Sequence, residues 1–266
     1  MPTISLSPRL AEEYCHLFDT CVINAGRMAE VEGILAKIEQ HRRRYDAVAE
    51  ALSMPWYVIA VIHSLESSLS FARHLHNGDP LDARTVRVPA GRPKTGSPPF
   101  TWEESAIDAL KYHELDAWQD WSLPGLLYKL EEYNGWGYRL YHPHILSPYL
   151  WSCSNHYQRG KYLADGVWSE TAVSRQTGAA VLLKALAEKG AVRFSGVAAA
   201  DPAVSAKPFL VYSMNEWSAY AQELQIFLNK FPGNSVKVDG FPGNETSEAF
   251  RRVTGFYLKG DPRAQA

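Results

Sequence analysis

The stretch WYVIAVIHSLESSLSF, residues 56–71, decides the fold that we expect for this chain. Pro55 precedes it and Asn77-Gly78 follows it, which predicts a helix of about five turns over residues 55–75. Most of its first ten residues are apolar, so we expect this helix to be buried. Glu66 is the one carboxylate in the stretch. Burial makes a carboxylate costly to ionise and raises its pKa, as a general acid near neutral pH requires.

The residues near Glu66 favour its position in a cleft, but they leave a second interpretation of this carboxylate open. His63 lies one turn earlier at i,i+3 spacing, so we expect it on the same helix face and treat it as a candidate substrate-binding residue. The polar run His74–Pro80 follows and predicts a loop beside Glu66. The alternative is an ordinary helix-edge carboxylate that reaches solvent or pairs with Arg73.

Composition limits the possible classes of protein. The 266 residues carry a formal charge of -2, which gives no basic excess for binding nucleic acid. The sequence has no run of 18 apolar residues, so we expect no membrane span. The N-terminus lacks the pattern of a signal peptide. The three cysteines show neither metal-ligand nor disulfide spacing, which predicts synthesis in a reducing cytoplasm.

Hydrophobic periodicity and breaker residues predict the remaining elements. Val86 and Val88 alternate with charged or polar residues, which indicates a short strand or hairpin over 84–88. An ordered loop or lid rich in proline follows it. Thr101 and Glu104 form a capping box, which gives Glu104 a structural role. We expect further helices over 8–23, 27–52, 102–114, 123–134, 169–189, 214–230 and 245–257, and a linker over 191–212.

Two short motifs resemble lysozyme-like lytic enzymes. Glu66-Ser67 at the end of an apolar helix, and Tyr133-Asn134-Gly135-Trp136-Gly137, resemble elements of goose-type lysozymes and soluble lytic transglycosylases. The resemblance covers residues 55–170, with an irregular β segment expected near 84–88. It implies that Glu66 is the catalytic acid and that the Tyr-Asn element lies in a sugar cleft. Thr101-Trp-Glu-Glu-Ser-Ala replaces the usual Gly-Leu-Met-Gln-type segment, which indicates a divergent family.

The tail resembles the peptidoglycan-binding module of cell-wall hydrolases. The motif is LQxxL at 224–228 followed by VDGxxGxxTxxAF at 238–250. Asp239-Gly240 suits a tight turn, and Thr246 is expected to cap the last helix. The predicted core of this module is Leu224, Leu228, Ala249, Phe250 and Val253. The alternative is a small helical unit with a purely structural role.

Nine aromatic residues between Tyr133 and Trp168 support a carbohydrate site independently, because sugar rings stack on aromatic faces. The alternative is that most of them fill a loop-rich core. Histidines 142, 144 and 156 lack metal-ligand spacing, so we expect no metal and no cofactor. The candidate substrate-binding residues in this segment are Tyr133, Asn134, Trp136, Tyr138 and Trp151.

Glycoside hydrolysis usually requires a second carboxylate, whereas a transglycosylase can use one acid because its substrate supplies the attacking oxygen. Asp79 follows the Glu66 helix at a turn and is the first candidate, although a turn-stabilising Asp before proline is common. Glu103 is the next candidate. The other carboxylates considered are Asp82 and Glu104.

Together these features predict a mainly α (α+β) protein. A lysozyme-like helical domain with a small hairpin, residues 1–195, precedes a peptidoglycan-binding-like module, residues 210–260. The expected function is cleavage of the β-1,4 glycan backbone of peptidoglycan by a muramidase of endolysin type. Such a protein would act at the cell wall or periplasm after release or export. The alternatives are a lytic transglycosylase, a hydrolase of chitosan or β-glucan, and a non-catalytic saccharide-binding protein.

Overall fold

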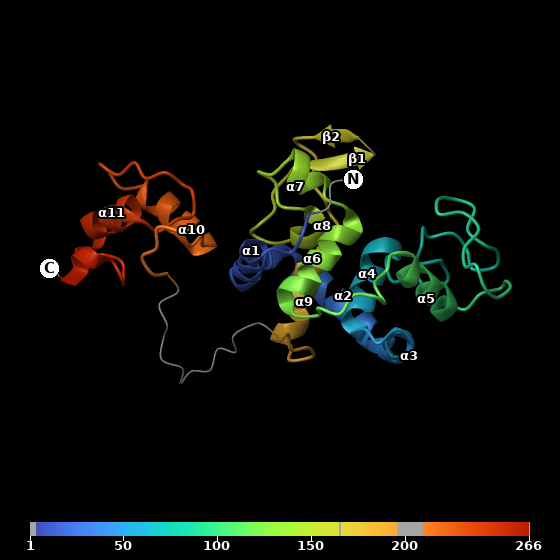
Figure 1. Ribbon diagram of the computed structural model, residues 1–266. Helices are drawn as coiled ribbons and strands as arrows, with labels where there is room; N and C mark the ends of the chain where they lie inside the picture. Colours follow the sequence, from blue (N-terminus) through green and yellow to red (C-terminus); the bar gives the residue numbers. More distant parts are fainter. Residues whose placement is uncertain (1–3, 165, 196–209, 266) are drawn as a thin grey trace. The chain divides into compact units, whose positions relative to one another are not determined.

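The computed structural model describes residues 4–164, 166–195 and 210–265 (Figure 1). About 48% of the chain is helical, and within the described residues eleven α-helices accompany one two-stranded hairpin. These proportions confirm the expected mainly α class. No single described helix is long and apolar enough to cross a membrane. The helices Arg42–Leu52 and Trp56–Ser67 meet that test only as a pair, across a bend of 115°.

The chain divides into two compact units. The first unit comprises Met1–Ser5 and Thr20–Gly196, and the second comprises Leu6–Asp19 and Val197–Ala266. The division falls inside the predicted linker 191–212, most of which lies outside the described residues. Residues 6–19 belong to the second unit, whereas the sequence placed them in the first domain.

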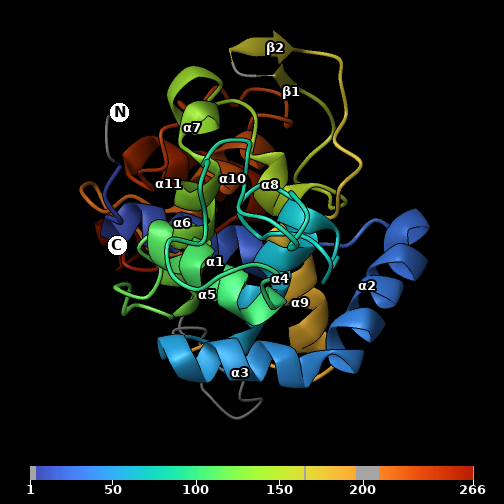
Figure 2. The ribbon, with the colours of Figure 1, turned by 90° about the vertical axis from the view of Figure 1, so that its right-hand side faces the viewer.

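Helix α4 (Trp56–Ser67) lies at the centre of the first unit (Figure 2). It packs against α3 (Arg42–Leu52) and α9 (Ala179–Glu188), and its residues 58–63 are all buried. The helix predicted over 27–52 is two helices, because a break at His41 separates α2 (Met28–Gln40) from α3. The break lets α2 pack on α9 while α3 packs on α4 and α5 (Trp102–Tyr112).

Helix α4 is shorter than predicted, which places Glu66 in its last turn. Ser68 adopts a left-handed conformation with φ 53°, and Leu69 follows with φ 59°. The N–H of Leu69 donates to the carbonyl of His63 at 3.2 Å and closes the helix end. Glu66 and Ser67 are therefore the last two residues of this buried helix.

The other helices of the first unit surround these. The capping box of Thr101 and Glu104 is confirmed at the start of α5. The helix predicted over 169–189 begins ten residues late, because Ser169 ends a strand and residues 170–178 form a loop. The remaining helices are α5 (Trp102–Tyr112), α6 (Leu123–Asn134), α7 (Gly137–Tyr141) and α8 (Pro148–Trp151).

The hairpin lies at a different place from the one predicted. Strands β1 (Lys161–Ala164) and β2 (Val167–Ser169) pair antiparallel, with Tyr162 opposite Trp168. Residues 84–88, where a strand was expected, form a loop instead. Val86 and Val88 are 80% and 87% exposed, so their alternation does not mark one buried face.

The second unit contains α1 (Pro8–Asp19), α10 (Ala219–Leu228) and α11 (Asn244–Thr254). Its apolar cluster contains all five residues predicted for the module core, together with Val236. Helix α1 packs on α10. His16 of α1 contacts Glu223 at 3.0 Å and lies edge-on to the ring of Tyr220, with centroids 4.2 Å apart.

Gln225 organises the turn of the second unit. Its buried side-chain amide donates to Asp239 Oδ1, Phe241 O and Thr246 Oγ1 at 2.9–3.1 Å. Its oxygen accepts from the N–H groups of Asp239 and Gly240. Gly240 has φ +77°, and a Cβ there would lie 2.2 Å from the Trp217 indole nitrogen, so the position requires glycine.

Thr246 does not cap α11, contrary to the sequence prediction. Gly243 occupies the N-cap position, and no side chain caps the helix there. The Thr246 hydroxyl instead accepts from the Gln225 amide and is buried. The threonine in the motif therefore ties α11 to α10.

Candidate functional site

Three helices bring a carboxylate and two tyrosines together in the first unit. Glu66 comes from the last turn of α4, Tyr149 from α8 and Tyr133 from the end of α6. The Tyr149 hydroxyl donates to Glu66 Oε1 at 3.0 Å. The rings of Tyr133 and Tyr149 stack with centroids 6.5 Å apart and an interplanar angle of 27°.

The segment before α9 secures the end of α4. The side-chain amide of Gln176 donates to the carbonyl of Leu65, the residue immediately before Glu66. The Ser67 hydroxyl donates to the carbonyl of His63 at 3.4 Å. Glu66 is therefore held between a fixed helix end and a hydrogen-bonded tyrosine.

The surroundings of Glu66 suit a proton donor. Glu66 is exposed as a residue, so a ligand can reach it, yet nearby protein atoms exclude much of the water from its carboxyl group. This desolvation raises the pKa of Glu66, and the hydrogen bond from Tyr149 lowers it in part. Burial, followed by the charge of Glu66, raises the pKa of Tyr133 and of Tyr149. Both hydroxyls therefore stay protonated at neutral pH and remain donors.

A polar pocket adjoins this site, and Tyr133 belongs to both. The pocket has a volume of about 280 Å³. The ring of His113 lies 4.4 Å from the ring of Tyr133. Burial lowers the pKa of His113, so its imidazole is neutral at pH 7. The other side chains that line the pocket include Tyr112, Glu114, Lys129 and Glu132.

His63 is not beside the Glu66 carboxylate in a cleft, contrary to the prediction. Its side chain is fully buried, and its Nδ1 hydrogen-bonds with the Tyr45 hydroxyl at 2.9 Å. The rings of Phe71 and Trp102 lie 4.6 and 4.5 Å away. Burial lowers the pKa of His63 to about 4, so it is a neutral core histidine.

The other predicted sugar-binding residues fall into two groups. Tyr133 lies next to Glu66, and Asn134, which follows it, is exposed. Trp136, Tyr138 and Trp151 are 7%, 7% and 1% exposed and belong to the core. For these three residues the structure supports the alternative, in which aromatic side chains fill a loop-rich core.

The predicted second carboxylates have structural partners elsewhere. Glu103 forms a two-pronged ion pair with Arg44, at 2.6 and 2.9 Å. Asp79 is 4% exposed and accepts from Val86 N at 2.8 Å, Arg87 N at 3.1 Å and Arg87 Nε at 2.6 Å. These donors, with the Arg87 backbone N–H first, lower the pKa of Asp79 to about 2. Asp79 therefore anchors the loop over 84–88 and is a weak base.

Replacement of Asp79 distinguishes a catalytic base from an anchor of the loop over 84–88. We expect Asp79→Asn to keep the rate of wall cleavage within about threefold of wild type, because the side chain accepts from donors of its own loop. We expect Tm to fall by about 2–5 °C, since a charge-assisted hydrogen bond to the loop is lost. Initial rates and thermal melting measure both effects. Asp116→Asn, at an exposed position in the same unit, is the control. A 100-fold rate loss at unchanged Tm would restore Asp79 as the base.

Within the described residues, no group of three or more His, Cys, Asp or Glu side chains could hold a metal ion. Comparisons with protein-family models, with curated proteins and with solved structures gave no match.

Proposed function

We propose that this protein cleaves the β-1,4 glycan backbone of peptidoglycan, with Glu66 as the general acid. The observation that carries the proposal is the Glu66 carboxyl group itself. It lies at the end of a buried helix, remains open to a ligand, has a raised pKa and is held by the Tyr149 hydroxyl. A protonated carboxyl group in such a place can donate to a glycosidic oxygen near neutral pH.

Tyr149 orients the acid for this step. It donates to Oε1 of Glu66, which leaves Oε2 to carry the proton toward the substrate. As the bond between the anomeric carbon and the leaving oxygen breaks, the proton moves from Glu66 to that oxygen. The resulting carboxylate is stabilised by the hydrogen bond from Tyr149.

Two versions of this function, hydrolysis and transglycosylation, differ in the group that attacks the anomeric carbon. Asp79, Glu103 and Glu104 are occupied by Arg87, Arg44 and Thr101, respectively. Because these three carboxylates already have partners, the geometry favours the one-acid route of a lytic transglycosylase over hydrolysis. In that route a hydroxyl of the substrate attacks the anomeric carbon, and its proton returns to the Glu66 carboxylate. The product then carries an anhydro end and no added water.

The pocket beside Tyr133 is the proposed position of a neighbouring sugar residue. Tyr133 and Tyr112 offer aromatic faces, and His113 offers a neutral imidazole that can pair with hydroxyls. Its volume of about 280 Å³ suits one sugar residue better than a large ligand. The second unit would hold the protein on the wall.

Mass spectrometry of digested peptidoglycan tests the proposed function. Anhydro ends would identify a transglycosylase, and reducing ends would identify a hydrolase with an unrecognised base or positioned water. Products from chitosan or β-glucan, but none from peptidoglycan, would move the assignment to another polysaccharide. Binding to walls without any product would favour a non-catalytic saccharide-binding protein.

The hydrogen bond between Tyr149 and Glu66 sets the pH range of cleavage. Tyr149→Phe removes a donor that favours the ionised carboxylate, so the pKa of Glu66 rises further. Since the acid must be protonated to act, we expect the basic limb of the rate profile to move to higher pH. The profile of kcat/KM against pH measures this shift. Tyr141→Phe, at a residue that is 70% exposed, is the matched control. A limb that moves to lower pH would contradict the proposed role of Glu66.

A further inference from the structure

The pocket beside Tyr133 contains a carboxylate, Glu114, at a backbone position that favours glycine. Glu114 follows the end of α5 and has φ 55°. Its N–H donates to the carbonyl of Lys111, and the N–H of Leu115 donates to the carbonyl of Leu110, both at 3.0 Å. These two bonds form a Schellman motif, whose left-handed residue is commonly glycine. A side chain in this conformation is strained, so the helix end itself does not explain a glutamate here.

Other helices of the chain end in the usual way. Helix α6 is followed by Gly135 with φ 92°, and α11 is followed by Gly255 with φ 85°. Five non-glycine residues in the described part of the chain have a positive φ, and Glu114 is the one among them that carries a charge. A strained backbone beside a candidate site indicates that the side chain has a role there.

The pocket has one negative charge in excess. Lys129 forms an ion pair with Glu132 at 2.7 Å. The exposed carboxylate of Glu114 has no recorded ion pair or hydrogen bond with any residue that the structure describes. The Arg92 guanidinium lies 4.5 Å from an aromatic ring of the pocket but pairs with Asp108 at 3.3 Å. Since the imidazole in the pocket is neutral, a cationic ligand would reach Glu114 without competition from a protein cation.

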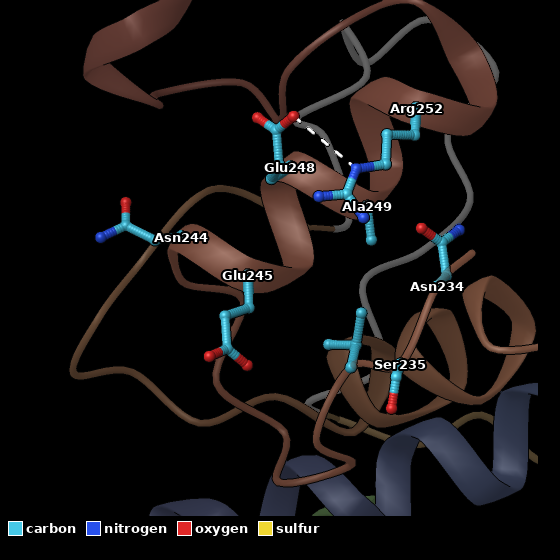
Figure 3. Close-up of a pocket in the computed structure, with 8 residues that line it drawn as sticks. Asn234, Ser235, Asn244, Glu245, Glu248, Ala249 and Arg252 are labelled. Carbon is cyan, nitrogen blue, oxygen red and sulfur yellow. Dashed lines mark ion pairs between the residues drawn. The ribbon is translucent and has the colours of Figure 1, made fainter.

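A pocket in the second unit lacks one part of this combination (Figure 3). It lies between α11 and the turn at residues 234–236, and no aromatic ring is among the described residues that line it. Two carboxylates line it, and one of them, Glu248, lies 3.9 Å from Arg252. A sugar ring would find no stacking surface there. The aromatic faces beside Glu114 therefore distinguish the pocket of the first unit.

We propose that the pocket beside Tyr133 prefers an amino sugar with a free 2-amino group over its N-acetylated form, and that Glu114 selects it. The ammonium group of the free sugar pairs with the Glu114 carboxylate while its ring stacks on an aromatic face. An N-acetyl group is a neutral amide, so it gains nothing from the negative charge. The inference rests on the proposed function, which places a sugar residue in this pocket. The protein would then favour glycans that carry deacetylated residues.

Calorimetry with two soluble probes tests the inference on the full chain carrying Glu66→Gln, which prevents turnover. One probe is the β-1,4 tetramer of N-acetylglucosamine, and the other is the same tetramer without its acetyl groups. At about pH 6 the amines are protonated. We expect the deacetylated tetramer to bind about threefold to fivefold more tightly, the size of a partly exposed ion pair. The preference should disappear at about 1 M salt, which screens exposed charges.

Two variants of Glu114 separate the charge from the backbone. Glu114→Gln keeps the shape of the side chain and should bind both tetramers with equal affinity. Glu114→Gly should also lose the preference, and its Tm should rise by about 2–4 °C because glycine adopts the left-handed conformation without strain. Glu32→Gln, at an exposed position on α2 outside the pocket, is the matched control and should keep the full preference.

Equal affinities in the protein that keeps Glu114, a preference that survives Glu114→Gln, or no binding of either tetramer overturns the inference. Release of products from walls is measured separately on the chain with Glu66 intact. Products without a preference between the tetramers would leave the proposed function standing and refute the inference. A preference that depends on Glu114, without any products from walls, would refute the proposed cleavage and leave the inference standing.

Discussion

Glu66→Gln should lower the rate of wall cleavage by about 100-fold or more, the contribution expected of a general acid. Glutamine keeps the shape of the side chain and can still accept from the Tyr149 hydroxyl, but it has no acidic proton. The measurement is the initial rate of release of soluble fragments from purified peptidoglycan. A variant that clears walls at a rate near that of wild type would show that Glu66 is not the acid.

The stability of the same variant has a predictable sign. Because folding raises the pKa of Glu66, the folded state binds more protons than the unfolded chain, and stability falls as pH rises from the unfolded to the folded pKa. At neutral pH the ionised carboxylate therefore costs stability, and Glu66→Gln should melt at the same temperature or higher. Glu50→Gln, at an exposed position on α3, is the control for loss of one charge. A rate loss accompanied by a lower Tm would point to misfolding.

Gln225→Ala should destabilise the second unit by about 3–5 kcal/mol, because it strands several buried polar groups at once. The N–H groups of Asp239 and Gly240 both lose their acceptor, and the Thr246 hydroxyl loses its donor. The Asp-Gly turn would then separate from α10. Wall binding should decrease as the second unit unfolds, while cleavage of short soluble fragments by the first unit should persist.

Hydrogen exchange resolved along the chain measures this effect. Protection should be lost in α10 and α11 and retained in α4 and α6. Gln222→Ala on the same helix is the matched control, since its side chain has no recorded hydrogen bond to any residue that the structure describes. Retained protection in the second unit of Gln225→Ala would mean that the amide network contributes little.

The parts of the fold that the sequence predicted are those set by local signals. The capping box fixed the start of α5, and Ser122 with Pro124 fixed the start of α6. The core of the second unit followed from the spacing of its apolar residues. The end of α4 could not be predicted in this way, because serine and leucine adopt the left-handed turn where glycine would have been the signal.

The candidate site depends on contacts that local patterns do not encode. Glu66 was predicted from its apolar neighbours, but its partner Tyr149 lies 83 residues further along the chain. Nothing in the spacing of the aromatic segment distinguishes Tyr149 from Trp151, which is buried two positions later. Helical spacing placed His63 one turn before Glu66, yet the cluster of Tyr45, Phe71 and Trp102 takes it into the core.

Helix α1 has a consequence for how the chain is made. It packs on α10, and its last residue, Asp19, precedes the first residue of α10, Ala219, by 219 − 19 = 200 positions. At about 5–20 residues per second, a ribosome needs about 10–40 s to synthesise that interval. During this time the apolar face of α1, with Tyr14 and Phe18, has left the ribosome without its partner. The nascent chain therefore presents a binding surface for a chaperone until α10, in the last fifth of the protein, emerges.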